Sequence, residues 1–435
     1  MTARLRPTDR EILGLAIPAL GALAIDPLLT LADTAFVARL GTNELAALGV
    51  DTAILGFAFF AFNFLAYVLT PLVAKALGAG RPDEARRWVG DAIVLAVGLG
   101  LLAAVVVEVF TPLFVEMMGA TEGVAGPAIS YLRIRVLATP AVLLVTVGHG
   151  AFRGHKDTKT PLLVALGVNL LNMVLDPILI FVFGWGLVGA AIATVVAQII
   201  GAIWFLRLLV SRSMAARPEG FAASLPSLLT LGKNGGLLTV RTAFLLGSFT
   251  VAASVATRIG PEEIAAYQLV SQLFLLAALL ADSFAVPAQA MSAETSARGD
   301  LHQLNALNRR LMAWGLVAGM ILMVGVGLGR FGLRWLASDP GVADVAVEAA
   351  GIVALAELVA ALVFVADGIF LGLFALGTMV VSTAAGAVVA VVLMLGTTLG
   401  DTVDGIWWAL AAMLVVRGLV FLFGYRSAAE TAVRS

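Results

Sequence analysis

The chain has 435 residues, of which 61% are apolar and 13% are charged, about half the charged fraction of a soluble globular domain. The net charge of −1 excludes the strongly basic field of a protein that binds nucleic acid. The absence of cysteine excludes disulfides, thiol catalysis and cysteine-ligated zinc. These features predict an integral membrane protein that contacts the lipid bilayer over much of its surface.

Apolar runs long enough to cross a bilayer, about 20 residues each, predict an all-α protein with twelve transmembrane helices. We expect these spans at residues 11–38, 48–74, 89–112, 127–151, 160–183, 187–210, 228–256, 263–290, 309–330, 345–370, 376–398 and 403–424. Most of the 27 basic residues fall in segments on the same side as the N-terminus. The positive-inside rule then predicts cytoplasmic termini in the inner membrane of a bacterium or archaeon.

A polar interruption near the middle and an internal repeat divide the chain into halves. We expect an N-lobe at 1–210, a cytoplasmic linker at 211–226 and a C-lobe at 227–435. A shift of 219 residues pairs Arg39, Gly41 and Glu44 with Arg258, Gly260 and Glu263. A shift of 218 residues pairs Phe152 and Gly154 with Phe370 and Gly372. Two parallel six-helix repeats of this kind are typical of transporters that alternate access between two lobes.

Polar side chains in the first half predict a site that responds to a cation. Ionisable groups within a span cost several kcal/mol unless they are solvated or paired, so they mark functional positions. Counting along the helices places several of them at one depth, roughly 6–10 Å below the outer surface. The members are Asp33, Tyr131, Asn172, Asp176 and Thr194. Two carboxylates with amide and hydroxyl neighbours can exchange protons, and Asp33, Asn172, Asp176 and Thr194 could instead ligate sodium through their oxygens.

The second half of the repeat lacks these polar groups. The repeat offsets pair the four oxygen-bearing residues Asp33, Asn172, Asp176 and Thr194 with Ala252, Ala390, Met394 and Met413. A purely structural role would more often be kept in both halves, so the asymmetry favours function. Hydrogen bonding between helices is the alternative.

Other polar residues are candidates for lining a substrate cavity: Asn169, His149, Asp367 and Gln272. The repeat pairs His149 with Asp367. Pro18 and Pro27 each remove a backbone hydrogen bond from the first span, which can therefore bend. Because that span also carries Asp33, its bending could be tied to protonation, and a static kink is the alternative. No phosphate-binding GxxxxGK[ST] loop and no HExxH motif occurs, so we expect neither ATP-driven transport within this chain nor an enzyme.

Three motifs resemble those of the multidrug and toxic compound extrusion (MATE) transporters, and within them the DNA-damage-inducible F (DinF) branch. They are LADTAFVARLG at the end of the first span, FRGHKDTKTP after the fourth and NLLNMVLDPIL in the fifth. The resemblance covers essentially the whole chain. It implies a V-shaped pair of lobes around a central cavity, and a cation-responsive site in the N-lobe at Asp33, Tyr131, Asn172, Asp176 and Thr194.

The resemblance also implies a secondary active multidrug exporter that exchanges amphiphilic, often cationic, small molecules for protons or sodium. We expect a monomer with no cofactor beyond the coupling ion. A flippase for lipid-linked precursors is the alternative from the same superfamily. It would need a more basic cavity for a diphosphate, and the spans hold few basic residues, namely Arg135, Arg241 and Arg417. A channel is a further alternative, which stoichiometric exchange of ion and substrate would exclude.

Overall fold

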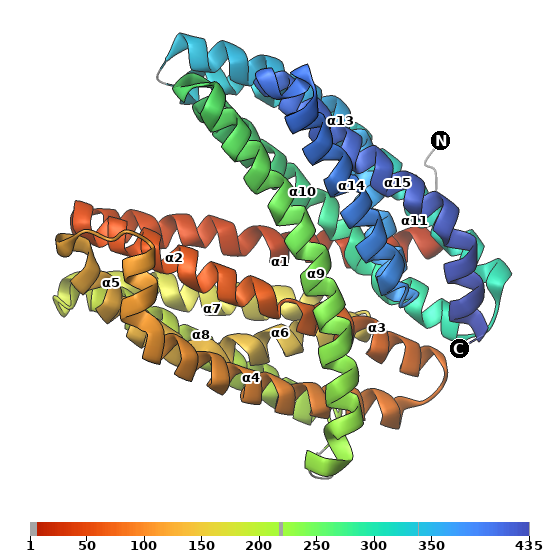
Figure 1. Cartoon of the computed structure of the whole chain (residues 1–435). Coiled ribbons are helices and arrows are strands. Elements are labelled where there is room, and N and C mark those ends of the chain that lie inside the picture. Colours follow the sequence, from red (N-terminus) through yellow and green to blue (C-terminus); the bar gives the residue numbers. More distant parts are fainter. Residues whose placement is uncertain (1–6, 217–220, 338, 435) are drawn as a thin grey trace, which may run out of the picture. The chain divides into compact units, whose positions relative to one another are not determined.

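The computed structural model describes residues 7–216, 221–337 and 339–434, and all regular secondary structure in these ranges is helical (Figure 1). The first-half helices are α1 (Pro7–Ala38), α2 (Thr42–Phe62), α3 (Phe64–Gly78), α4 (Pro82–Met117), α5 (Glu122–Arg135), α6 (Thr139–Gly154), α7 (Lys159–Pro177) and α8 (Gly186–Ser211). The second-half helices are α9 (Phe221–Ile259), α10 (Pro261–Ala297), α11 (Leu301–Gly329), α12 (Leu333–Leu336), α13 (Pro340–Gly372), α14 (Leu376–Gly396) and α15 (Val403–Arg434).

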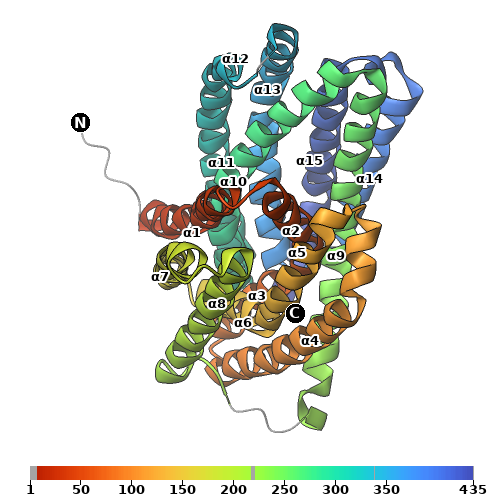
Figure 2. The same cartoon turned by 90° about the vertical axis from the view of Figure 1, so that its left-hand side faces the viewer.

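The helices form two compact units. The first-half unit comprises Gly21–Gly235, and the second-half unit comprises Met1–Leu20 together with Gly236–Ser435. Helices α1 and α9 therefore each contribute to both units. Within the predicted linker 211–226, residues 217–220 lie outside the described residues and α9 begins at Phe221. Figure 2, turned by 90°, shows α7 beside α8 in the first-half unit.

The observed helices follow the predicted spans closely. Among the described residues, eleven helical segments are long and apolar enough to cross a membrane. The remaining predicted span, 48–74, consists of α2 and α3, which meet at Asn63. Asn63 keeps helical backbone angles, φ −58° and ψ −20°, and its side chain makes no capping bond to α3. Most helices extend beyond the predicted ends because their polar termini continue the helix outside the apolar run, as α15 does to Arg434.

An ion pair explains why the beginning of α1 groups with the second half. The Asp9 side chain is 1% exposed. It accepts hydrogen bonds from Arg310 Nε at 2.5 Å and Arg310 Nη2 at 2.6 Å. Trp314 Nε1 donates a third bond at 2.9 Å. A bidentate arginine–carboxylate contact fixes direction as well as distance, so it anchors the first turns of α1 to α11.

Close packing between α4 and α6 depends on Gly100. A Cβ atom at this position would lie 2.5 Å from Pro140 Cα, which is backbone and cannot rotate away. We therefore expect Gly100→Ala to lower the free energy of unfolding by about 1–3 kcal/mol, measured as a lower melting temperature in detergent. Gly98 on the same helix has open space at its Cβ position. Gly98→Ala is the matched control, and an equal loss in both variants would contradict the packing argument.

The loop between α6 and α7 is fixed by Asp157. Its carboxylate accepts hydrogen bonds from the Thr160 backbone N–H at 2.9 Å and from Arg212 Nη1 at 2.9 Å. Partial burial opposes ionisation, but these bonds outweigh it and hold the pKa of Asp157 below its usual range. The Arg212 guanidinium also lies 5.2 Å from the centre of the Phe152 ring. The FRGHKDTKTP motif thus connects α6 to α7 through a loop that these contacts hold in place.

A pH dependence follows from this lowered pKa. A depressed folded-state pKa adds stability that is present at neutral pH and is lost as the pH falls through that pKa. We expect Asp157→Asn to lower stability by about 1 kcal/mol at pH 7. The difference from the wild type should shrink as the pH falls below about 4, as followed by thermal melting. Asp83→Asn removes an exposed ion pair with Arg86 and should change little at either pH.

Candidate functional site

Two carboxyl groups form the centre of the candidate site. Asp33 lies on α1 and Asp176 lies near the end of α7. Asn172 Nδ2 donates to Asp176 Oδ2 at 2.8 Å, as the spacing of four residues on one helix allows. The carboxyl groups of Asp176 and Asp33 are in hydrogen-bonding contact. Two carboxyl groups can share a hydrogen bond only when one of them carries a proton, so the pair has the chemistry of a proton-binding site.

The end of α7 changes its helical geometry directly after Asp176. Pro177 follows, and the backbone continues as a π-helix, η2 (Ile178–Val182). Proline has no N–H to complete the α-helical pattern, and π-helical turns often occur at functional positions. Asp176 is 1% exposed and its Oδ1 atom receives no hydrogen bond from a donor. The carboxyl group is thus buried and incompletely satisfied.

Tyr131 lies in the same unit and in the same electrostatic neighbourhood. Its side chain is buried on α5 among apolar residues of α1, α2 and α8. Asp33, Asp51, Arg135 and Asp176 all act electrostatically on it. The structure therefore brings together four of the residues predicted for this site, Asp33, Tyr131, Asn172 and Asp176.

Two further charged residues, which were not predicted for this site, belong to the same neighbourhood. Asp51 on α2 is fully buried, and neither of its carboxylate oxygens has a hydrogen-bond partner among the described residues. Arg135, the last residue of α5, acts electrostatically on Asp33, Asp51 and Asp176. Its Nε and Nη1 atoms are buried, with no hydrogen-bond partner in the described ranges. One arginine can balance one of three carboxylates, so the others need a proton or a bound cation to avoid burying unbalanced charge.

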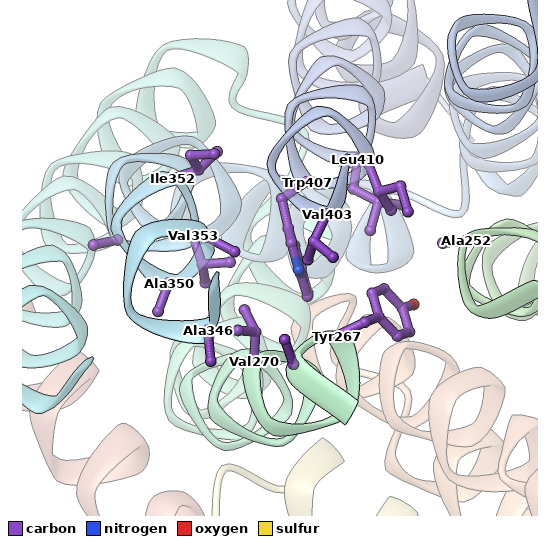
Figure 3. Close-up of a cluster of buried hydrophobic side chains, with 14 of the residues drawn as sticks. Ala252, Tyr267, Val270, Ala346, Ala350, Ile352, Val353, Val403, Trp407 and Leu410 are labelled. Carbon is purple, nitrogen blue, oxygen red and sulfur yellow. The ribbon is translucent and has the colours of Figure 1, made fainter. Parts of the chain in front are cut away.

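The internal repeat could have found these residues. The offset of 219 pairs Asp51 with Val270, and the offset of 218 pairs Tyr131 with Ala349 and Arg135 with Val353. Figure 3 shows Val270 and Val353 together with Ala252, the counterpart of Asp33. All seven counterparts belong to one buried apolar cluster in the second-half unit: Ala252, Val270, Ala349, Val353, Ala390, Met394 and Met413. Positions that are polar in the first half are thus a packed apolar core in the second.

The remaining predicted residues of the first half make local contacts. Thr194 Oγ1 donates to the Ala190 carbonyl of its own helix at 3.0 Å. Asn169 Nδ2 donates to the Ala165 carbonyl at 2.9 Å. The His149 ring lies on α6 with its centre 5.3 Å from that of Phe205.

Two predicted residues of the second half occupy different places. Gln272 lines a cavity of about 390 Å³ in the second-half unit, together with Gln268 and Asp339. Asp367 is instead bound by Arg241 and Arg417.

Helix α1 runs without interruption across both of its predicted bending points. Pro18 and Pro27 lie inside Pro7–Ala38. The boundary between the two units falls between them, after Leu20. The bending of α1 with protonation stays a prediction.

Known proteins share this sequence over most of its length. The MatE family model matches residues 18–178. Protein DETOXIFICATION 44, chloroplastic, from Arabidopsis thaliana is 32% identical over 421 residues, which cover 94% of this chain and 80% of that protein. The chain belongs to the MATE family. This MATE protein is also 28% identical to DNA damage-inducible protein F of Escherichia coli (strain K12), over 96% of the chain and 92% of that protein.

The fold agrees with the family. The structure of the Vibrio cholerae MATE transporter VcmN in the bent form superposes with a TM-score of 0.90 at 18% identity, covering 98% of both chains. The prediction of an all-α membrane fold is confirmed. Since MATE proteins are transporters, the expectation that the chain is not an enzyme is also confirmed. It is a multi-pass membrane protein.

Proposed function

We propose that this MATE protein is a secondary active exporter of amphiphilic small molecules, driven by cations through the Asp33–Asp176 pair. The hydrogen-bonding contact between the two carboxyl groups carries the proposal. Uptake of a proton there would neutralise a buried charge, and its release would restore it. Each change alters the free energy of a buried site by several kcal/mol, which is enough to favour one arrangement of α1 over another.

Protons suit this cluster better than sodium. A shared proton satisfies both carboxyl groups without further ligands, whereas a bound metal cation needs several oxygens around it. Arg135 adds a fixed positive charge that opposes a second cation.

The proposal includes the setting of the protein. We place it as a monomer in a bacterial or archaeal cytoplasmic membrane, with both termini on the cytoplasmic side. The bias of basic residues between the two sides of the chain supports this orientation. Alternating access of two lobes would then carry substrate outward, and the family resemblance makes amphiphilic cations the first class to test.

Flux measurements in liposomes test the coupling. The purified full chain is reconstituted, and efflux of ethidium, an amphiphilic cation, is followed under an imposed proton gradient or an imposed sodium gradient. We expect the proton gradient to drive efflux and the sodium gradient to have little effect. Efflux that follows only the sodium gradient would overturn proton coupling, and efflux that ignores both gradients would overturn antiport.

A further inference from the structure

Three charged side chains meet in the second-half unit, from helices α9, α13 and α15. Arg241 Nη2 donates to Asp367 Oδ2 at 2.6 Å, and Arg417 Nη2 donates to the same oxygen at 2.5 Å. The side chains of Asp367 and Arg417 are 6% and 2% exposed. Two guanidinium groups thus share a single oxygen of one buried carboxylate.

The cluster carries a surplus positive charge. The charged groups that act on Arg417 include the Asp367 carboxylate and the Arg241 guanidinium. Two arginines and one aspartate leave one unbalanced positive charge, because arginine does not lose its proton in proteins. A buried unbalanced charge is costly unless another group compensates it. The cluster therefore has the charge for one more anionic group.

The cluster is closely packed around Arg417 and partly exposed at Arg241. Helix α14 packs closely against Arg417 at Gly386. A Cβ atom added to Gly386 would lie only 3.0 Å from Arg417 Cγ. Ser382 Oγ donates to the Arg417 carbonyl at 3.3 Å. The Arg241 side chain, in contrast, keeps 16% of its surface exposed. Arg241 is thus the most exposed member of the cluster.

The three charged side chains also have hydrogen-bonding atoms that are not used. Asp367 Oδ1, Arg241 Nε and Arg417 Nε are buried and have no hydrogen-bond partner within the part of the chain that the structure describes. A guanidinium group binds a carboxylate through two parallel N–H bonds, and both arginines use only Nη2 for Asp367. The unused Nε of Arg241 is itself buried, so an incoming carboxylate engages it only after the Arg241 side chain rotates.

We propose that Arg241, Arg417 and Asp367 form a binding site for the carboxylate of an exported amphiphilic acid. The inference rests on the proposed export function and defines its substrate class by charge. The site is specific to the second half: the repeat places Ala22, Gln198 and His149 opposite Arg241, Arg417 and Asp367. The first half thus holds an acidic cluster that binds the coupling cation, and the second half holds a basic cluster that binds the substrate.

The charge count favours a carboxylate over a diphosphate. A single surplus positive charge is neutralised by one carboxylate. A diphosphate carries more negative charge and would leave part of it buried and unbalanced. The ligand is therefore a small monocarboxylate with an apolar body, not a lipid-linked diphosphate.

Binding of three matched fluorescent probes to the purified full chain in detergent tests the site. Dansylglycine carries one carboxylate, dansylglycinamide is its neutral amide and dansylcadaverine is a cation. We expect the wild type to bind dansylglycine about tenfold or more tightly than dansylglycinamide. Equal affinities, or tighter binding of dansylcadaverine, would overturn the proposal. Geranyl diphosphate is added as a competitor. If it displaces dansylglycine at a lower concentration than unlabelled carboxylates do, the carboxylate site is overturned in favour of a diphosphate site.

Arg241→Gln is the decisive variant. It leaves Asp367 and Arg417 as a neutral pair, so the melting temperature should be at least that of the wild type. The preference for dansylglycine over its amide should be lost, and Arg241→Lys should keep part of it. Arg258→Gln on the same helix is the control, because Arg258 is exposed. An Arg241→Gln protein that keeps the full preference would overturn the site.

The two proposals fail separately. Gradient-driven efflux without a carboxylate preference would leave the exporter standing and overturn the carboxylate site. Carboxylate binding without gradient-driven transport of either dansylglycine or ethidium would support the site and overturn the exporter.

Discussion

Replacing Asp176 with Asn is expected to lower proton-driven efflux by at least about tenfold while the protein remains folded. The amide side chain keeps the volume of Asp176 and can keep its contact with Asn172, but it cannot gain or lose a proton. Asp33→Asn should have the same effect, because the two carboxyl groups are in hydrogen-bonding contact. Efflux from liposomes under a proton gradient measures both variants.

The double variant sharpens this expectation. Groups that share one proton act as a unit, so removing both should cost little more than removing either. Glu108→Gln is the control, because Glu108 is an exposed acid of the same unit that pairs with Arg133. If both single variants transport at the wild-type rate and still depend on the proton gradient, the assignment of the site is refuted.

The membrane spans could be predicted from the sequence because burial in lipid demands long apolar runs. The residues at which helices begin and end could not be predicted in this way, because polar ends such as the end of α15 continue the helix beyond the apolar run. The break at Asn63 divides one apolar run into α2 and α3 without interrupting its hydrophobicity. Pro177 gives a local signal for the end of α7, but not for the π-helix that follows it.

The acidic cluster could be predicted in part. The spacing of Asn172 and Asp176 places them on one helical face, and depth counting brings Asp33 to the same level. The contacts of Asp51 and Arg135 depend on how α2 and α5 pack, which residue spacing does not reveal. Likewise, Asp367 was expected beside a cavity, but its two arginines come from α9 and α15. Comparing the two halves position by position is the signal that identifies all of these residues.

Arg135→Gln is expected to make efflux responsive to sodium. Arg135 contributes a fixed positive charge near Asp33, Asp51 and Asp176. At an effective dielectric constant of roughly 20, one charge acts on another about 8 Å away with about 2 kcal/mol. Removing the charge should therefore raise the affinity of the acidic cluster for sodium by about tenfold or more. Efflux driven by a sodium gradient alone should increase accordingly.

Arg133→Gln is the matched control for this change. Arg133 lies two residues earlier on α5, is half exposed and pairs with Glu108 at 3.3 Å. Its loss removes the same formal charge from the same helix without changing the field at Asp33 and Asp176. Sodium-driven efflux that rises equally in both variants would indicate a general effect of surface charge. A rise confined to Arg135→Gln would support Arg135 as the residue that makes the cluster select protons over sodium.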